Sequence, residues 1–142
     1  MLLYIKIQTL KKIIPLIAFV FFASLAHSQT FLSFCTWVNG DNQECVFENT
    51  RFITSPDSTH GRLFMMLRGN KVFGTAKLTF KIYEIDRFGN EVQVNTVVQE
   101  VKPDWMNSWQ PATFVSPGIY MVKVYTDDGN MITSRGFEFF NL

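Results

Sequence analysis

Hydrophobic and polar residues alternate along much of the chain beyond residue 28, with the period of two that is typical of β-strands. The pattern is clearest in residues 119–140. Residues 119–126 alternate, the run Asp-Asp-Gly-Asn at 127–130 is typical of a turn, and residues 131–140 return. This predicts a β-hairpin. The expected core side of its first strand consists of Tyr120, Val122 and Val124.

A second hairpin is predicted over residues 76–101. Its first strand ends at the turn Arg-Phe-Gly-Asn at 87–90, and Pro103 ends its second strand, since proline cannot donate to a β-ladder. Shorter apolar runs predict further strands at residues 31–38, 45–53 and 62–68. The last of these runs is unbroken, which favours a strand buried on both faces. Residues 105–114 are rich in aromatic residues and are predicted to form an irregular connector.

These segments amount to about seven strands, with turns at roughly the 8–12-residue spacing of a β-sandwich and no predicted helix after the first 28 residues. β-branched and aromatic residues are frequent throughout, which favours strands over helices. The pattern therefore predicts an all-β antiparallel sandwich. The 114 residues from Gln29 to Leu142 are enough for one domain with its own core.

The first 28 residues are typical of a cleavable signal peptide. Three lysines precede the uncharged apolar run Ile13–Leu25, and Ala26-His27-Ser28 supplies small residues for cleavage before Gln29. The alternative is an uncleaved anchor, but the run is shorter than the roughly 20 residues that span a bilayer. Lipidation at Cys35 is disfavoured because bulky Phe34 precedes it. We expect a signal peptide at 1–28, a single domain at 29–142 and export to the periplasm, the outer membrane or the medium.

Charge and cysteine content narrow the expected partners. Without the signal peptide, ten basic residues remain against twelve acidic ones, and no basic face stands out, so nucleic acid is not an expected partner. Cys35 and Cys45 are the only cysteines, and an oxidising compartment favours a disulfide between them around a short turn. A redox or metal site and two free thiols are the alternatives, but the C-x-x-C spacing is missing and no histidine lies nearby.

Residues 109–140 carry a resemblance. Trp109 is followed by Phe114, by Ser116-Pro117-Gly118-Ile119-Tyr120 and by alternating valines. This order resembles the immunoglobulin-like and fibronectin-III-like domains of secreted bacterial proteins. The resemblance implies an immunoglobulin-like sandwich in which Tyr120 forms a tyrosine corner, with its ring in the core and its hydroxyl bonded to a nearby backbone group.

No catalytic constellation is identifiable. His60 is the only histidine beyond the signal peptide, and it lies in a polar loop whose neighbours are too close in sequence to converge on it. The acidic turn at 127–130 has oxygen ligands that suit calcium but lacks the DxDxDG spacing, so we interpret it as a turn. We therefore expect no enzyme activity, no cofactor and no metal.

Two sets of residues are candidates for binding. Trp105 and Trp109 can cover one end of the core, stack on sugar rings or form a protein interface. The other set consists of apolar residues on strand faces that are otherwise polar or that point away from the core. These residues form a contact patch if the hairpins predicted at 76–101 and 119–140 lie side by side in one sheet. Its members are Tyr83, Ile85, Ile119, Met121 and Tyr125. The leading hypothesis is a non-catalytic module that docks on another envelope or extracellular protein through this patch. The alternative is a carbohydrate-binding module that uses the tryptophans.

Overall fold

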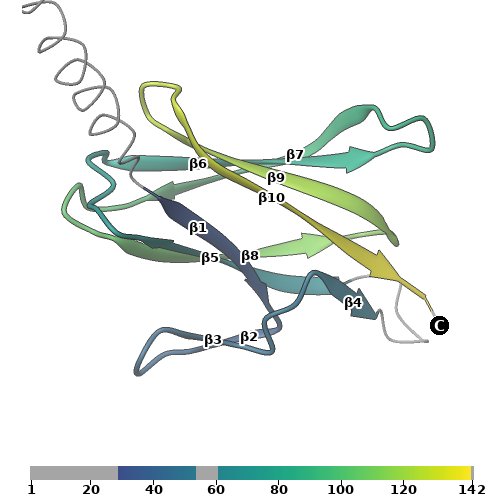
Figure 1. Ribbon diagram of the computed structural model, residues 1–142, viewed down its shortest axis with the longest axis horizontal. Helices are drawn as coiled ribbons and strands as arrows, with labels where there is room; N and C mark the ends of the chain where they lie inside the picture. Colours follow the sequence, from purple (N-terminus) through teal and green to yellow (C-terminus); the bar gives the residue numbers. More distant parts are fainter. Residues whose placement is uncertain (1–28, 54–60, 142) are drawn as a thin grey trace, which may run out of the picture.

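The computed structural model describes residues 29–53 and 61–141, and every helix or strand assigned in these ranges is a β-strand (Figure 1). The predicted signal peptide and His60 lie outside the described residues. Within the described ranges, no helix is long and apolar enough to cross a membrane. The strands are β1 (Thr30–Cys35), β2 (Trp37–Asn39), β3 (Glu44–Val46), β4 (Arg51–Ile53), β5 (Gly61–Gly69), β6 (Lys77–Ile85), β7 (Glu91–Glu100), β8 (Asn107–Phe114), β9 (Gly118–Thr126) and β10 (Met131–Phe140).

Two sheets pack face to face, which confirms the predicted all-β sandwich. One has the order β1-β5-β8 and the other β4-β10-β9-β6-β7, while β2 and β3 form a separate short hairpin (Figure 1). All pairs are antiparallel except the parallel pair of β4 and β10. The two predicted long hairpins are confirmed as β6–β7 and β9–β10. Pairing of β6 with β9 joins them in one sheet.

The core lies between the two sheets and is rich in aromatic rings. Tyr120 is stacked on Phe137 with ring centroids 5.4 Å apart, and Phe114 meets Phe137 edge-on at 4.8 Å. Such edge-to-face and stacked contacts stabilise aromatic clusters beyond the area that they bury. The fully buried side chains of this core include Phe34, Leu63, Met65, Leu67, Leu78, Phe80, Ile82, Val122 and Val124.

The tyrosine corner is confirmed. The Tyr120 hydroxyl donates to the backbone carbonyl of Ser116 at 2.7 Å, and it lies 3.1 Å from the Ser116 hydroxyl. The side chain is almost completely buried. The bond ties the start of β9 to the segment that follows β8, so it fixes the crossing between the two sheets.

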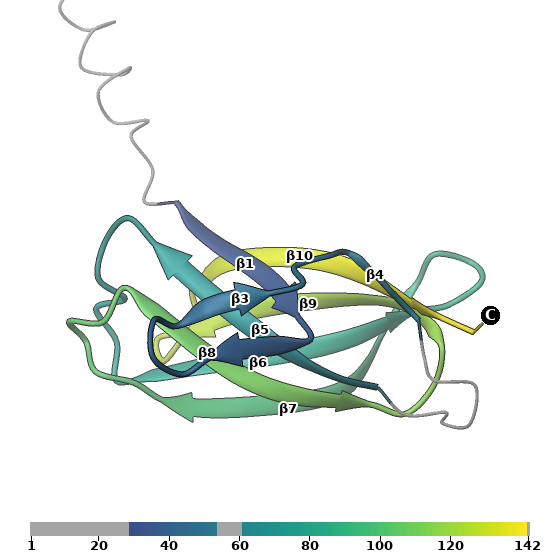
Figure 2. The ribbon, with the colours of Figure 1, turned by 90° about the horizontal axis from the view of Figure 1, so that it is seen from below.

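The expected double burial of β5 has a specific cause. Alternate residues of the strand face the main core, whereas Met66 points to the other side of the sheet. There it packs with Cys35 and Val38 beneath the β2–β3 hairpin, which lies over the outer face of the three-stranded sheet (Figure 2). A disulfide between Cys35 and Cys45 closes this hairpin, with Cα atoms 5.5 Å apart, and confirms the predicted pairing.

Three details of the prediction are wrong. Residues 107–114 form a regular edge strand, β8, because they pair along the whole of β5, and an edge position tolerates Pro111. The runs 31–38 and 45–53 are each two strands, so that together with β8 the described residues contain ten strands rather than the predicted seven. The alternation of Val92, Val94, Thr96 and Val98 predicts one shared face for β7, but a bulge at Val94 interrupts it, and Val97 packs against the core beyond the bulge.

Candidate functional site

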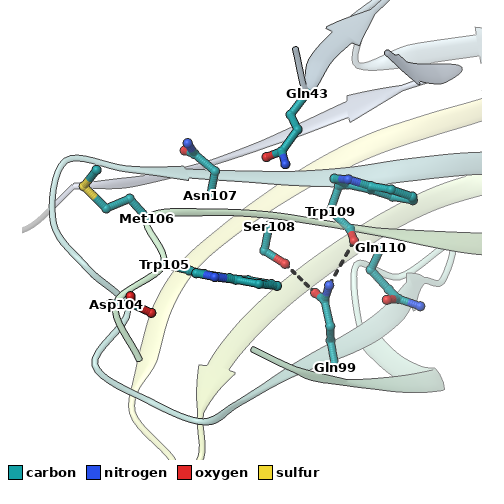
Figure 3. A pocket seen from close by; sticks show the side chains of 9 residues that line it. All are labelled: Gln43, Gln99, Asp104, Trp105, Met106, Asn107, Ser108, Trp109 and Gln110. Carbon is teal, nitrogen blue, oxygen red and sulfur yellow. Dashed lines mark hydrogen bonds between the residues drawn. The ribbon is translucent and has the colours of Figure 1, made fainter. Parts of the chain in front are cut away.

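A hollow of about 590 Å³ opens where the connector after β7 meets β8 and the tip of the β2–β3 hairpin (Figure 3). Its walls combine two indoles, one thioether and side chains that bear amide, hydroxyl or carboxylate groups. An apolar surface with a few polar groups is the usual composition of a small-molecule site. The lining residues are Gln43, Gln99, Asp104, Trp105, Met106, Asn107, Ser108, Trp109 and Gln110.

Backbone hydrogen bonds hold the connector in place. The N–H of Phe73 donates to the carbonyl of Trp105 at 2.8 Å, and the N–H of Gly69 donates to the carbonyl of Met106 at 2.8 Å. The N–H of Gly74 reaches the carbonyl of Pro103 at 2.9 Å. The backbone that carries the first indole is therefore fixed against the loop between β5 and β6.

The two tryptophans lie on the surface, not at an end of the core. Trp105 is 41% exposed and Trp109 is 38% exposed, and neither belongs to the core cluster. Trp109 lies on the outer face of β8, where its ring meets Phe64 of β5 edge-on at a centroid distance of 5.7 Å. The interpretation of these residues as a cover for the core is wrong. β8 turns Ser108 inward and the adjacent Trp109 outward, and Trp105, in the connector before β8, is exposed and lies outside the core cluster.

A polar bridge crosses the open edge of the sandwich behind the indoles. The buried Ser108 hydroxyl donates to Oε1 of Gln99 at 2.6 Å, and Nε2 of Gln99 donates to the Trp109 carbonyl at 3.0 Å (Figure 3). Gln99 belongs to β7 and Ser108 to β8, so the bridge joins the two sheets. It also holds the Gln99 side chain in a fixed position at the wall of the hollow.

The electrostatics of the hollow are simple. Asp104 is the one ionisable residue among the nine that line it, and the remaining polar side-chain groups are uncharged: amides, a hydroxyl and the indole N–H groups. Such a surface offers hydrogen-bond donors and acceptors but no cation to pair with an anionic ligand. The lining therefore disfavours an anionic ligand.

Sequence reasoning identified the two indoles but missed their polar neighbours. Inward alternation would have identified Ser108 if residues 107–114 had been read as a strand. Gln43 and Gln99 have no such signal, because a hairpin tip and a neighbouring sheet bring them to the hollow. Their positions follow from long-range pairing alone.

The structure also brings the predicted contact patch together. In the pairing of β6 with β9, Tyr83 lies opposite Met121 and Ile85 lies opposite Ile119. Tyr125 follows on the same outward face. Ile119 is 53% exposed, whereas the other four side chains are half-buried.

Lysine side chains cover part of this patch. Nζ of Lys81 lies 4.9 Å from the ring centre of Tyr125, and Nζ of Lys123 lies 4.9 Å from that of Tyr83. Lys123 also donates to Glu91 at 2.5 Å, and this bond raises the pKa of its ammonium group. Partial burial raises the pKa of Tyr83. The lysines shield the rings, so the freely accessible apolar surface centres on Ile119.

In the acidic turn at 127–130, the carboxylate of Asp128 makes hydrogen bonds within the turn itself. Asp128 accepts hydrogen bonds from the Thr126 hydroxyl and from the Asn130 amide, which lowers the pKa of its carboxyl group. Across residues 29–53 and 61–141, no group of three or more His, Cys, Asp or Glu side chains is arranged to hold a metal ion.

Comparisons with known proteins identify the fold. No protein-family model matches the chain, and no curated protein matches it. An immunoglobulin-like protein from Pseudomonas aeruginosa superposes with a TM-score of 0.52 at 15% identity, over 81% of this chain and 98% of that one. A superoxide reductase (neelaredoxin) from Ignicoccus hospitalis gives a TM-score of 0.43 at 12% identity, over 84% and 85% of the two chains. The first match shows that this chain has an immunoglobulin-like sandwich.

Proposed function

We propose that this chain is a non-catalytic secreted binding module and that the hollow between Trp105 and Trp109 binds a neutral carbohydrate. The observation that carries the proposal is the pair of exposed indoles at one polar hollow. A pyranose ring has an apolar face of C–H groups, which packs on an indole. Its rim of hydroxyl groups matches amide side chains, which both donate and accept hydrogen bonds.

Several features of the site agree with this proposal. The backbone of Trp105 and the side chain of Gln99 are held by hydrogen bonds before any ligand arrives, so little ordering is needed on binding. The disulfide is typical of proteins that fold in an oxidising compartment, which agrees with the expected export. The absence of a basic residue in the lining favours neutral sugars over uronic or sulfated ones.

The test is binding of the purified protein to an array of neutral and acidic glycans, followed by titration of the best neutral ligand. Trp105→Ala and Trp109→Ala should each weaken binding by at least about tenfold, which corresponds to about 1.4 kcal/mol. Phe88→Ala is the control, because Phe88 is 74% exposed, lies in the turn between β6 and β7 and does not line the hollow. The proposal fails if no neutral glycan binds or if the control variant loses as much affinity as the other two.

Docking on another envelope or extracellular protein is the second candidate function. The β6–β9 register favours it, because this register gathers the five predicted residues on one outward face. Exposed aliphatic residues beside aromatic rings are typical of contact surfaces. The face would act alongside the sugar site, since the two share no lining residue.

A charge introduced at the centre of this face tests the docking function. Ile119→Asp should release a co-purifying envelope protein, while the unfolding midpoint stays close to that of the wild type. Val72→Asp is the control, since Val72 is equally exposed but lies in the loop between β5 and β6. Docking through this face is ruled out if the partner remains bound to the Ile119 variant.

A further inference from the structure

The β2–β3 hairpin forms one side of the tryptophan hollow. It lies across the outer face of the three-stranded sheet, and its tip reaches the hollow beside β8 (Figures 2 and 3). Val38 and the disulfide pack on Met66 at its base. The remaining pairing in the hairpin is limited to three residue pairs, which is too little for independent stability.

The tip of this hairpin is held in an unusual conformation. Gln43 has a φ of 52°, in the left-handed region that residues other than glycine rarely adopt. Side-chain bonds within the turn support it, since the N–H of Glu44 donates to Asn42 and the N–H of Asp41 donates to Asn39. Strained residues of this kind cluster at ligand sites, where their orientation matters more than their cost.

The side chain of Gln43 lines the hollow. Figure 3 shows it extending from the hairpin toward the space between the two indoles. It is the one lining residue from outside the segment 99–110. A long amide side chain placed there can bond to a hydroxyl group of a ligand that stacks on an indole.

We infer that Gln43 is a recognition residue of the carbohydrate site and that the Cys35–Cys45 disulfide is required to position it. The inference rests on the proposed function of the hollow. When the disulfide is opened, the hairpin loses its covalent closure and its tip samples many conformations. Ligand binding must then order the tip again, which lowers affinity without any change in the two indoles.

The inference is tested by titrating the neutral glycan that binds best to the oxidised protein. Gln43→Ala should weaken binding by about fivefold to tenfold, the range expected for one hydrogen bond to an uncharged group. Glu44→Ala is the matched control. Glu44 is next to Gln43 in the chain, but its side chain is exposed and does not line the hollow, so this variant should bind the glycan with wild-type affinity.

Reduction provides the second arm of the test. Dithiothreitol, a dithiol, transfers two electrons and two protons to the disulfide, which gives two cysteine thiols and a cyclic oxidised dithiol. After reduction, the affinity of the wild type should fall at least to that of Gln43→Ala. Reduction should change the affinity of Gln43→Ala by less than about twofold, because reduction and the substitution both remove the contact between Gln43 and the ligand. Near-ultraviolet circular dichroism verifies that the sandwich stays folded.

The outcomes separate this inference from the function on which it rests. If the oxidised wild type binds no neutral glycan, the proposed function and this inference both fail. If it binds but Gln43→Ala retains full affinity, only the role of the hairpin is overturned. Equal losses on reduction in the wild type and in Gln43→Ala would also overturn it, because the disulfide would then act through another part of the site.

Discussion

Replacing Tyr120 by phenylalanine removes one hydrogen bond from the tyrosine corner and little else. The ring stays between Phe137, at a centroid distance of 5.4 Å, and Phe114, at 5.0 Å. The change deletes the hydroxyl that donates to the Ser116 carbonyl at 2.7 Å. The buried area of the ring is kept, so the cost reports the hydrogen bond rather than a cavity.

The size of the stability loss depends on whether the Ser116 carbonyl finds another hydrogen-bond partner. The net loss of one hydrogen bond costs about 1 kcal/mol, and a carbonyl left without a partner raises this to as much as about 3 kcal/mol. A hollow of about 130 Å³ lined by Tyr120 and Ser116 opens beside the bond, so water can reach the group. We therefore expect a loss of about 1–2 kcal/mol.

Urea unfolding followed by tryptophan fluorescence measures this loss. A domain of this size unfolds with a slope of about 1–2 kcal/mol per molar urea, so the midpoint should fall by about 0.5–2 M at unchanged slope. Tyr83→Phe is the control, because its side chain lies on the outward, half-buried face of the five-stranded sheet, where water can replace the contact of its hydroxyl with Tyr125. Its midpoint should stay within about 0.3 M of the wild type. Equal shifts in the two variants would refute the role assigned to the corner.

Two further predictions concern other parts of the fold. The Ser33 hydroxyl and then Arg135 hold the pKa of Glu48 below its ordinary value of 4.5, so the stability that this carboxylate contributes is present above pH 4.5 and is lost as the pH falls through the lowered pKa. In urea titrations, Glu48→Gln should therefore lower the free energy of unfolding by less than about 1 kcal/mol at pH 7, since the side chains of Glu48 and Arg135 are both partly exposed. At pH 2 the substitution should have no effect on stability. An equal loss at both pH values would contradict this prediction. Gly129 has a φ of +85° with open space around its Cβ position, so Gly129→Ala should cost about 1 kcal/mol in the same assay. Gly40→Ala, at a position that is equally open but without a positive φ, should cost nothing, and equal losses in the two variants would show that conformation is not the cause.

The hairpins were predictable because their signals are local. In β6–β7 and β9–β10, alternation, a turn with glycine and a returning strand all lie within about 25 residues of each other. The disulfide was equally accessible, since its cysteines flank one short turn. The tyrosine corner was found through the resemblance, because Pro-Gly-x-Tyr stands directly before an alternating strand.

The errors arise where distant pairing decides the structure. Residues 107–114 contain a proline and carry no clear alternation of hydrophobic residues, yet β5 supplies a complete partner, and its pairing outweighs the weak local preference. No glycine lies at the bulge at Val94, so the local sequence does not predict it. Phe47, with a φ of 54°, follows the end of β3, inside the stretch 45–53 that was predicted as one strand.

The same distinction explains what was found at the candidate site. Trp105 and Trp109 attract notice in any sequence, but the role of Trp109 depends on which way β8 turns it, and that of Trp105 on how the connector before β8 is held. Assigning that segment as a connector made a cover over the core the natural interpretation. Once β8 is a strand, Ser108 faces inward and Trp109 outward, and an indole on the outer face can meet a ligand.

The hydrogen bonds of Gln99 affect whether the open edge of the sandwich at β8 can pair with another strand. An edge strand such as β8 presents backbone groups that can pair with an incoming strand. The Trp109 carbonyl already accepts from Gln99, and the side chain of Gln99 fills the space beside it. An added strand would have to displace this bond and the buried bond from Ser108. The edge beside the hollow therefore resists strand addition at this point.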